Sequence, residues 1–118
     1  MILEQIREKA CQYAREYWEL EFDAVIIVNP GFSRILGQAS LSDHGYRIEF
    51  CPGFINGTYS DRAVEKIVKH EVCHWALMKK GLPYHDGNPV FEAELERIGA
   101  GSWTNPLSAN CIRNFIYA

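Results

Sequence analysis

The stretch that decides the fold is residues 60–83, which read SDRAVEKIVKHEVCHWALMKKGLP. Ser60 is a residue type that caps helix N-termini, and Asp61 complements the positive end of the helix dipole. At the other end, Lys80 precedes Gly81, which readily takes the left-handed conformation that follows a last helical turn. The stretch therefore predicts a long helix from about Asp61 to Lys80.

The residues before this helix predict one further helix and a small sheet. Residues 2–20 place apolar side chains at spacings of three and four, which is typical of a helix with one buried face. Residues 22–28 form a short apolar run that predicts a buried strand. Residues 37–41 and 46–50 flank a turn that contains Gly45, so they predict a hairpin. We expect a three-stranded, mostly antiparallel sheet.

The residues after residue 83 predict a third helix. Asn88 is a capping residue, and Pro89 takes the first helical position that proline favours. The helix is expected to end near Gly99, and residues 112–117 could form a final strand. Together these elements predict an α+β fold, and the length of 118 residues suits one domain that spans residues 1–118.

Composition and charge exclude several classes of protein. The 47% hydrophobic and 23% charged residues are those of an ordinary globular chain. A net charge of −3 argues against a domain that grips nucleic acid by charge alone. No stretch has the apolar length of a membrane span, and the acidic N-terminal residues do not match a signal peptide. We expect a cytoplasmic, monomeric protein whose four cysteines are free thiols.

A metal-binding pattern lies within the long predicted helix. His70 and His74 are four residues apart, so their rings point the same way and can converge on one ion. Glu71 is turned about 100° around the helix axis, which keeps it off the metal but within reach of a metal-bound water. The spacing predicts a Zn²⁺ site with Glu71 as the general base.

A third protein ligand is expected, because catalytic zinc sites usually have three and leave the fourth position to water. By residue type the best donor is His85, in the turn after the helix. Its neighbour Asp86 is the main alternative. Glu94, on the next predicted helix, is a further candidate, since it stands twenty residues after His74.

The sequence resembles the SprT-like metallopeptidase family, to which the DNA–protein crosslink protease Spartan belongs. The resemblance covers nearly the whole chain and rests on Leu36-Gly37 before the hairpin, Arg47-Ile48-Glu49-Phe50, Ile67 to His74, Gly81-Leu82-Pro83-Tyr84-His85 and Phe91. It implies a zincin-like fold, two helical zinc ligands at His70 and His74, and a catalytic glutamate at Glu71. It also implies a protein or peptide substrate and DNA as a possible partner.

The chain departs from the family pattern at two places. The family's third ligand is a histidine shortly before the aromatic residue of the next helix, whereas His85 stands six residues before Phe91 and Asp86 is closer to the usual place. Many bacterial relatives continue into a cysteine-rich zinc ribbon, but only Cys111 follows the site here. Either the ribbon is absent or the chain is a truncated catalytic core, and we expect a single domain without a ribbon.

The leading hypothesis from the sequence is a zinc-dependent peptidase, with Tyr84, Tyr59 and Arg34 as candidate oxyanion stabilisers by chemistry alone. Two other functions are compatible with the same residues. One is a zinc-containing module without turnover that binds protein or DNA. Glu71 argues against it, because such a module has no use for a general base. The other is a small-molecule zinc hydrolase or amidase, which a deep closed pocket would favour.

Overall fold

The computed structural model describes residues 1–104 and 111–113. It contains the helices α1 (Leu3–Trp18), α2 (Asp61–Lys80) and α3 (Pro89–Ile98), the strands β1 (Val25–Val28), β2 (Gly37–Ser42) and β3 (Gly45–Phe50), and a short 3-10 turn (Pro52–Phe54). The predicted α+β class is confirmed. The final strand expected at residues 112–117 lies for the most part outside the described residues.

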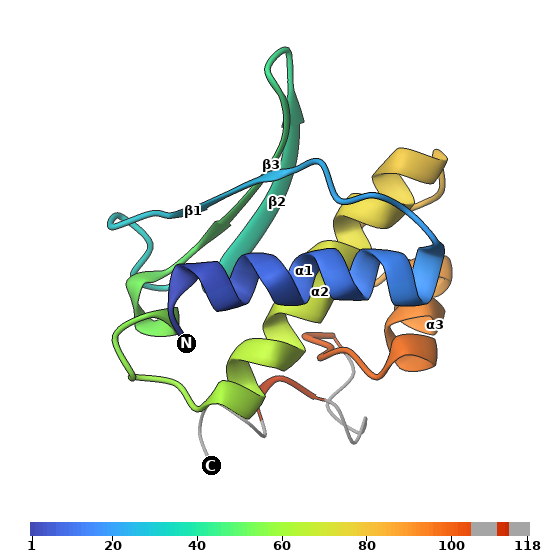
Figure 1. The fold of residues 1–118 in the computed structure, drawn as a ribbon. Helices are drawn as coiled ribbons and strands as arrows, with labels where there is room; N and C mark the ends of the chain where they lie inside the picture. Colours follow the sequence, from blue (N-terminus) through green and yellow to red (C-terminus); the bar gives the residue numbers. More distant parts are fainter. Residues whose placement is uncertain (105–110, 114–118) are drawn as a thin grey trace.

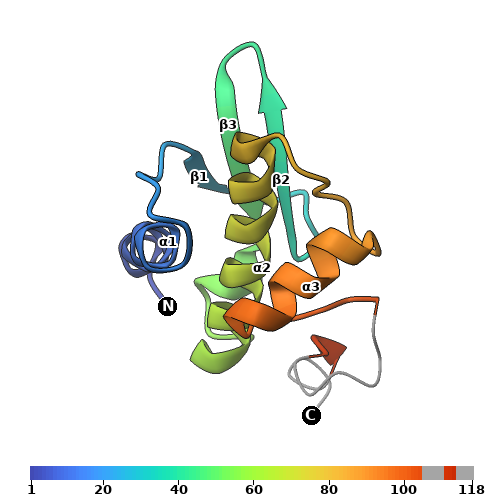
Figure 2. The same ribbon diagram turned by 90° about the vertical axis from the view of Figure 1, so that its right-hand side faces the viewer.

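Helix α2 is the centre of the molecule. In Figure 2, α1 is seen end-on on one side of α2 and α3 lies on the other, while the sheet stands over α2. Contacts link α2 to α1, α3, β2 and β3. Twelve of its twenty residues are buried, including the whole run from His70 to Leu77. The pattern on this helix is therefore held inside the molecule and not on a solvated face.

The ends of α2 are those that the sequence predicts. The Ser60 side chain accepts a hydrogen bond from the Ala63 N–H at 3.2 Å, which satisfies one of the free donors of the first turn. Gly81 takes the left-handed conformation with φ of 68°, and its N–H bonds back to the last turn. These two caps fix the register of the helix, and with it the positions of His70 and His74.

The sheet is mixed, with strand order β1-β3-β2. Strands β2 and β3 form the expected antiparallel hairpin, and β1 pairs with β3 in parallel. The hairpin projects beyond the body of the molecule (Figure 1). Because β3 is central, the outer edge of β2 has no strand partner among the described residues, and β2 contacts α2.

Strand β1 begins later than the apolar run from Phe22 predicts. The Phe22 ring packs on Trp75 with ring centroids 4.9 Å apart, and Asp23 accepts hydrogen bonds from the Trp75 indole and from Lys79. These side chains anchor the segment to α2, so pairing with β3 starts only at Val25.

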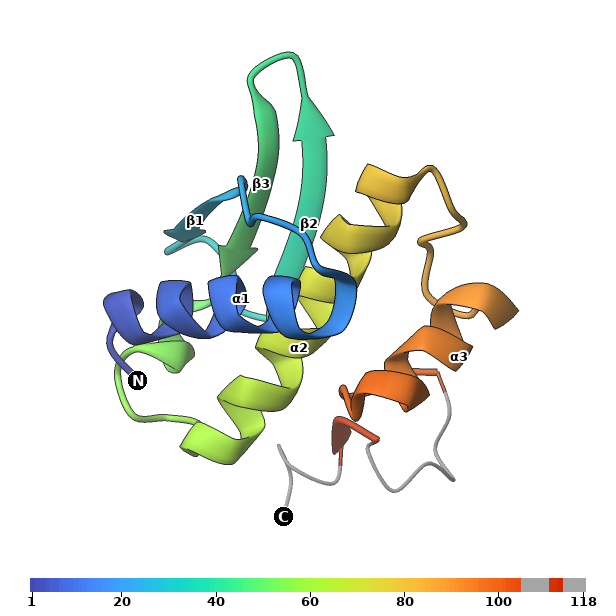
Figure 3. The ribbon, with the colours of Figure 1, turned by 45° about the vertical axis from the view of Figure 1, so that its right-hand side comes forward.

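Helix α1 covers the opposite side of α2 from α3 (Figure 3). Its buried side chains are Ile6, Ala10, Tyr13, Ala14 and Trp18. Three of the four cysteines are also buried, as expected of free thiols that pack as small hydrophobes. None of the described helices is both long enough and apolar enough to cross a membrane.

Candidate metal centre

The two helical histidines face each other inside the protein. Their Nε2 atoms are 3.2 Å apart, and His70 and His74 are only 1% and 9% exposed. Phe91 of α3 packs on both rings, stacked on His74 at 4.1 Å between centroids and edge-on to His70 at 5.5 Å. The helix sets the one-turn spacing of the two histidines, and packing on Phe91 fixes the orientation of their rings.

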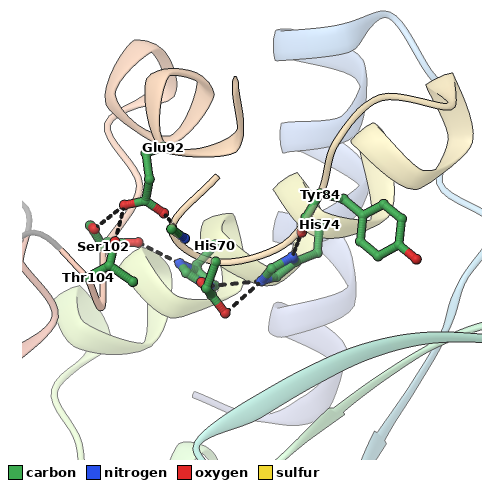
Figure 4. A network of polar contacts seen from close by, with 9 residues as sticks. His70, His74, Tyr84, Glu92, Ser102 and Thr104 are labelled. Carbon is green, nitrogen blue, oxygen red and sulfur yellow. Dashed lines mark hydrogen bonds and ion pairs between the residues drawn. The ribbon is translucent and has the colours of Figure 1, made fainter. Parts of the chain in front are cut away.

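Backbone carbonyls determine which ring nitrogen of each histidine is free. His70 Nδ1 lies 2.6 Å from the Gly101 carbonyl oxygen, and His74 Nδ1 lies 2.5 Å from the Tyr84 carbonyl oxygen (Figure 4). A carbonyl only accepts, so both Nδ1 atoms carry the proton. In the neutral imidazoles both Nε2 lone pairs therefore point into the same small space.

Asp86 completes this group. Its carboxylate oxygens lie 3.0 Å from His70 Nε2 and 3.5 Å from His74 Nε2. Ligand atoms that bind zinc tetrahedrally at 2.0–2.2 Å are about 3.3–3.6 Å apart. The three observed separations, 3.2, 3.0 and 3.5 Å, are close to that range. Two imidazole nitrogens and one carboxylate, whose Oδ1 faces His70 and whose Oδ2 faces His74, fit a cation between them.

The electrostatics of Asp86 and His70 follow from this contact. Partial burial by itself would raise the pKa of Asp86, but the contacts of its carboxylate with the His70 and His74 imidazoles outweigh burial and hold that pKa well below the usual value. Burial would lower the pKa of His70, and the contact with Asp86 outweighs it, so the net pKa is raised. The carboxylate is therefore ionised and ready to bind a positive charge.

Glu71 lies beside the histidines: one ligand-type atom from each of His70, Glu71 and His74 lies within 4.8 Å of the other two. It is 3% exposed, and its Oε2 has no hydrogen-bond partner among the described residues. Burial raises the pKa of Glu71 above the usual value. A buried oxygen without a protein partner is placed to accept a hydrogen bond from a water, as a general base must.

His85 and Glu94, the other two candidate ligands, have different surroundings. His85 is exposed, its ring packs on Tyr84 with ring centroids 4.5 Å apart, and it lines the same pocket as His74 and Asp86. The Glu94 carboxylate accepts hydrogen bonds from Trp18 and Arg97. Of the three candidates, only Asp86 contacts both Nε2 atoms.

A pocket of about 310 Å³ opens beside the histidines. It is bounded by the start of β2, by α2 and by the turn after α2, and its lining includes Gly37, Gln38, Glu71, His74 and Asp86. A Cβ atom on Gly37 would lie 3.0 Å from Glu71 Cγ. The glycine at the start of the edge strand therefore leaves room for the Glu71 side chain.

The three candidate oxyanion stabilisers lie in different places. Tyr84 lines the pocket, although its ring extends away from His70 and His74 in Figure 4. The Tyr59 ring packs edge-on against Phe54, and Arg34 is exposed in the loop before β2. The structure does not bring them together. Cys73, inside the motif, is buried, and burial raises the pKa of its thiol.

Sequence reasoning missed the groups that orient His70 and His74. The carbonyls of Tyr84 and Gly101 have no sequence signal, because every residue carries one. Glu92 accepts a hydrogen bond from Gly87, the residue after Asp86. Its sequence position indicates only that an acidic residue suits the first turn of a helix, and does not indicate this contact.

Comparison with known proteins agrees with the resemblance. The sequence model of the SprT-like family matches residues 6–110 of the 118-residue chain. No curated protein and no solved structure matches the chain significantly. The chain belongs to the SprT-like family.

Proposed function

We propose that the protein is a zinc-dependent peptidase whose metal is held by His70, His74 and Asp86. The observation that carries the proposal is the convergence of two Nε2 atoms and one carboxylate next to a buried glutamate with an unpaired oxygen. Family membership supports the same reading. The donor set, two imidazoles and one carboxylate, is one that catalytic zinc sites use.

When bound, zinc would lower the pKa of water to about 7 and polarise the substrate carbonyl. Glu71 accepts the proton of the attacking water through its buried carboxylate. Its raised pKa favours the second half of this role, in which Glu71 donates the proton to the leaving amine. His70 and His74 would hold the metal through their Nε2 atoms, because both Nδ1–H groups are bound to carbonyls.

The substrate we propose is an extended peptide segment. The outer edge of β2 has no strand partner among the described residues, and Gly37, Gln38 and Ala39 of this strand line the pocket beside Glu71. An extended chain can pair with such an edge through its backbone. This mode of binding would place a peptide carbonyl near the histidines with little dependence on side-chain sequence.

Glu71→Gln tests the catalytic part of the proposal. The variant is expected to bind zinc like the wild type and to lose hydrolysis of an unfolded protein substrate by about 10²-fold or more, because the amide accepts no proton. Glu65→Gln, on the same helix but half-buried beside Lys9, is the control and should keep full activity. Activity that survives Glu71→Gln would rule out this residue as the base.

Separate alanine variants test the third ligand. Asp86→Ala should weaken zinc binding by at least about 10-fold, because it removes one of three ligands. His85→Ala, one residue away and exposed, should leave the zinc dissociation constant unchanged. The opposite result would assign the third position to His85.

A further inference from the structure

Glu92 joins two segments of the chain that lie on either side of His70. It lies in the first turn of α3, and its Oε2 accepts a hydrogen bond from the Gly87 N–H at 3.2 Å. Its Oε1 accepts hydrogen bonds from the hydroxyls of Ser102 at 2.7 Å and Thr104 at 2.6 Å (Figure 4). One carboxylate therefore holds the turn before α3 and the segment after it.

Each of these segments carries a group that touches His70. Asp86 directly precedes Gly87, and its carboxylate lies 3.0 Å from His70 Nε2. Gly101 directly precedes Ser102, and its carbonyl oxygen lies 2.6 Å from His70 Nδ1. The two groups thus contact opposite nitrogens of one ring, and Glu92 binds the residue next to each of them.

The turn that carries Asp86 is held at its start by the Tyr84 carbonyl on His74 Nδ1, and the Asp86 carboxylate itself contacts both imidazoles. A backbone hydrogen bond across the turn runs from the Asn88 N–H to the His85 carbonyl at 3.1 Å. Gly87 has φ of 85°, as the third residue of a type II turn requires. His85, Asp86 and Gly87 are all exposed, so side-chain packing restrains this turn weakly. The hydrogen bond from Gly87 to Glu92 ties this turn to α3, directly beside Asp86.

We propose that Glu92 is a positioning residue for the metal centre, which sets zinc affinity by fixing the Asp86 turn and the Gly101 carbonyl around His70. The inference rests on the proposed function, since it takes Asp86 as a ligand. A carboxylate suits this position because two oxygens accept from three donors on two sides. A glutamine has one carbonyl oxygen, so it can accept hydrogen bonds on one side only. Its NH₂ group then faces either the Gly87 N–H or the two hydroxyls, and the bonds that Glu92 accepts on that side are lost.

The experiment compares Glu92→Gln with the matched control Glu96→Gln, an exposed glutamate one turn further along α3. Zinc dissociation constants are measured by competition with a chromophoric chelator, the absorption spectrum of the Co²⁺-loaded protein is recorded, and the metal-free proteins are melted. Residues that hold metal ligands in place typically change metal affinity about 10- to 100-fold. We expect that weakening and a changed Co²⁺ spectrum for Glu92→Gln, and neither for Glu96→Gln.

A role confined to folding would move the melting temperature of the metal-free protein and leave zinc affinity and the Co²⁺ spectrum unchanged. That result overturns the inference while the proposed function stands. A wild-type protein that binds no zinc overturns both.

A second variant keeps the test valid if Glu92→Gln does not fold. Ser102→Ala removes one hydroxyl donor to Glu92 and should weaken zinc binding in the same direction but less. If both variants fold, their effects on the zinc dissociation constant should be less than additive in the double variant, because both break one network. Additive effects would contradict the proposal that Glu92 and Ser102 act through one hydrogen-bond network.

Discussion

Gly37→Ala would place a methyl group between the edge strand β2 and Glu71, the proposed general base. The new Cβ atom would lie 3.0 Å from Glu71 Cγ, 3.3 Å from Glu71 Cδ and 3.2 Å from Phe50 Cδ1. Phe50 is fully buried in the core and Glu71 is held within α2, so neither neighbour moves without disturbing its surroundings. Backbone strain does not contribute, since Gly37 is not among the residues of positive φ.

Overpacking of this kind costs about 1–3 kcal/mol. For a domain of this size, each kcal/mol lowers the melting temperature by about 4 °C, which gives an expected decrease of about 4–12 °C in metal-free protein. Hydrolysis should fall as well, because Glu71 must shift, whereas zinc affinity should change little because the proposed ligands are His70, His74 and Asp86. Gln38→Ala, at the next position of β2 and exposed, is the control for stability. A Gly37→Ala protein as stable and as active as the wild type would refute the reasoning.

Three further predictions concern the scaffold and the metal. Ser60→Ala removes the side-chain cap of α2 and should destabilise the protein by about 1 kcal/mol in urea denaturation, whereas unchanged stability would show that the cap contributes nothing. Partial burial would raise the pKa of Asp23, but hydrogen bonds from Lys79 and Trp75 outweigh it and lower that pKa. The ionised Asp23 therefore stabilises the fold above about pH 4, and this stabilisation is lost as the pH falls through the lowered pKa. The difference in stability between wild type and Asp23→Asn should shrink on acidification, and a constant difference would contradict this account. Chelation of zinc should lower the melting temperature, since free zinc at 100 times its dissociation constant stabilises the folded state by about 2.7 kcal/mol, and an unchanged melting temperature would show that zinc does not bind the native state.

The sequence predicts those features that depend on local chemistry. Helix α2 begins after Ser60 and ends before Gly81 because capping residues act within one turn of the chain. The convergence of His70 and His74 follows from the pitch of that same helix. The hairpin of β2 and β3 follows from alternation on both sides of a short turn that ends at Gly45, which has φ of 100°.

Features that depend on contacts between distant segments could not be predicted in the same way. The parallel pairing of β1 with β3 depends on how Phe22 and Asp23 dock on α2. The position of Asp86 depends on a turn that Gly87 allows and that Glu92 holds from α3. Residue type therefore favoured His85, whereas the geometry of the turn brings the carboxylate of Asp86 to both imidazoles.

The central claim is that His70, His74 and Asp86 together hold one zinc ion beside Glu71. The most direct measurement is a crystal of the zinc-loaded protein with anomalous scattering recorded above and below the zinc absorption edge. The account predicts one strong peak, about 2.0–2.2 Å from both Nε2 atoms and from an oxygen of Asp86. A crystal with no anomalous peak between the histidines, or a peak whose third protein ligand is His85, would contradict it.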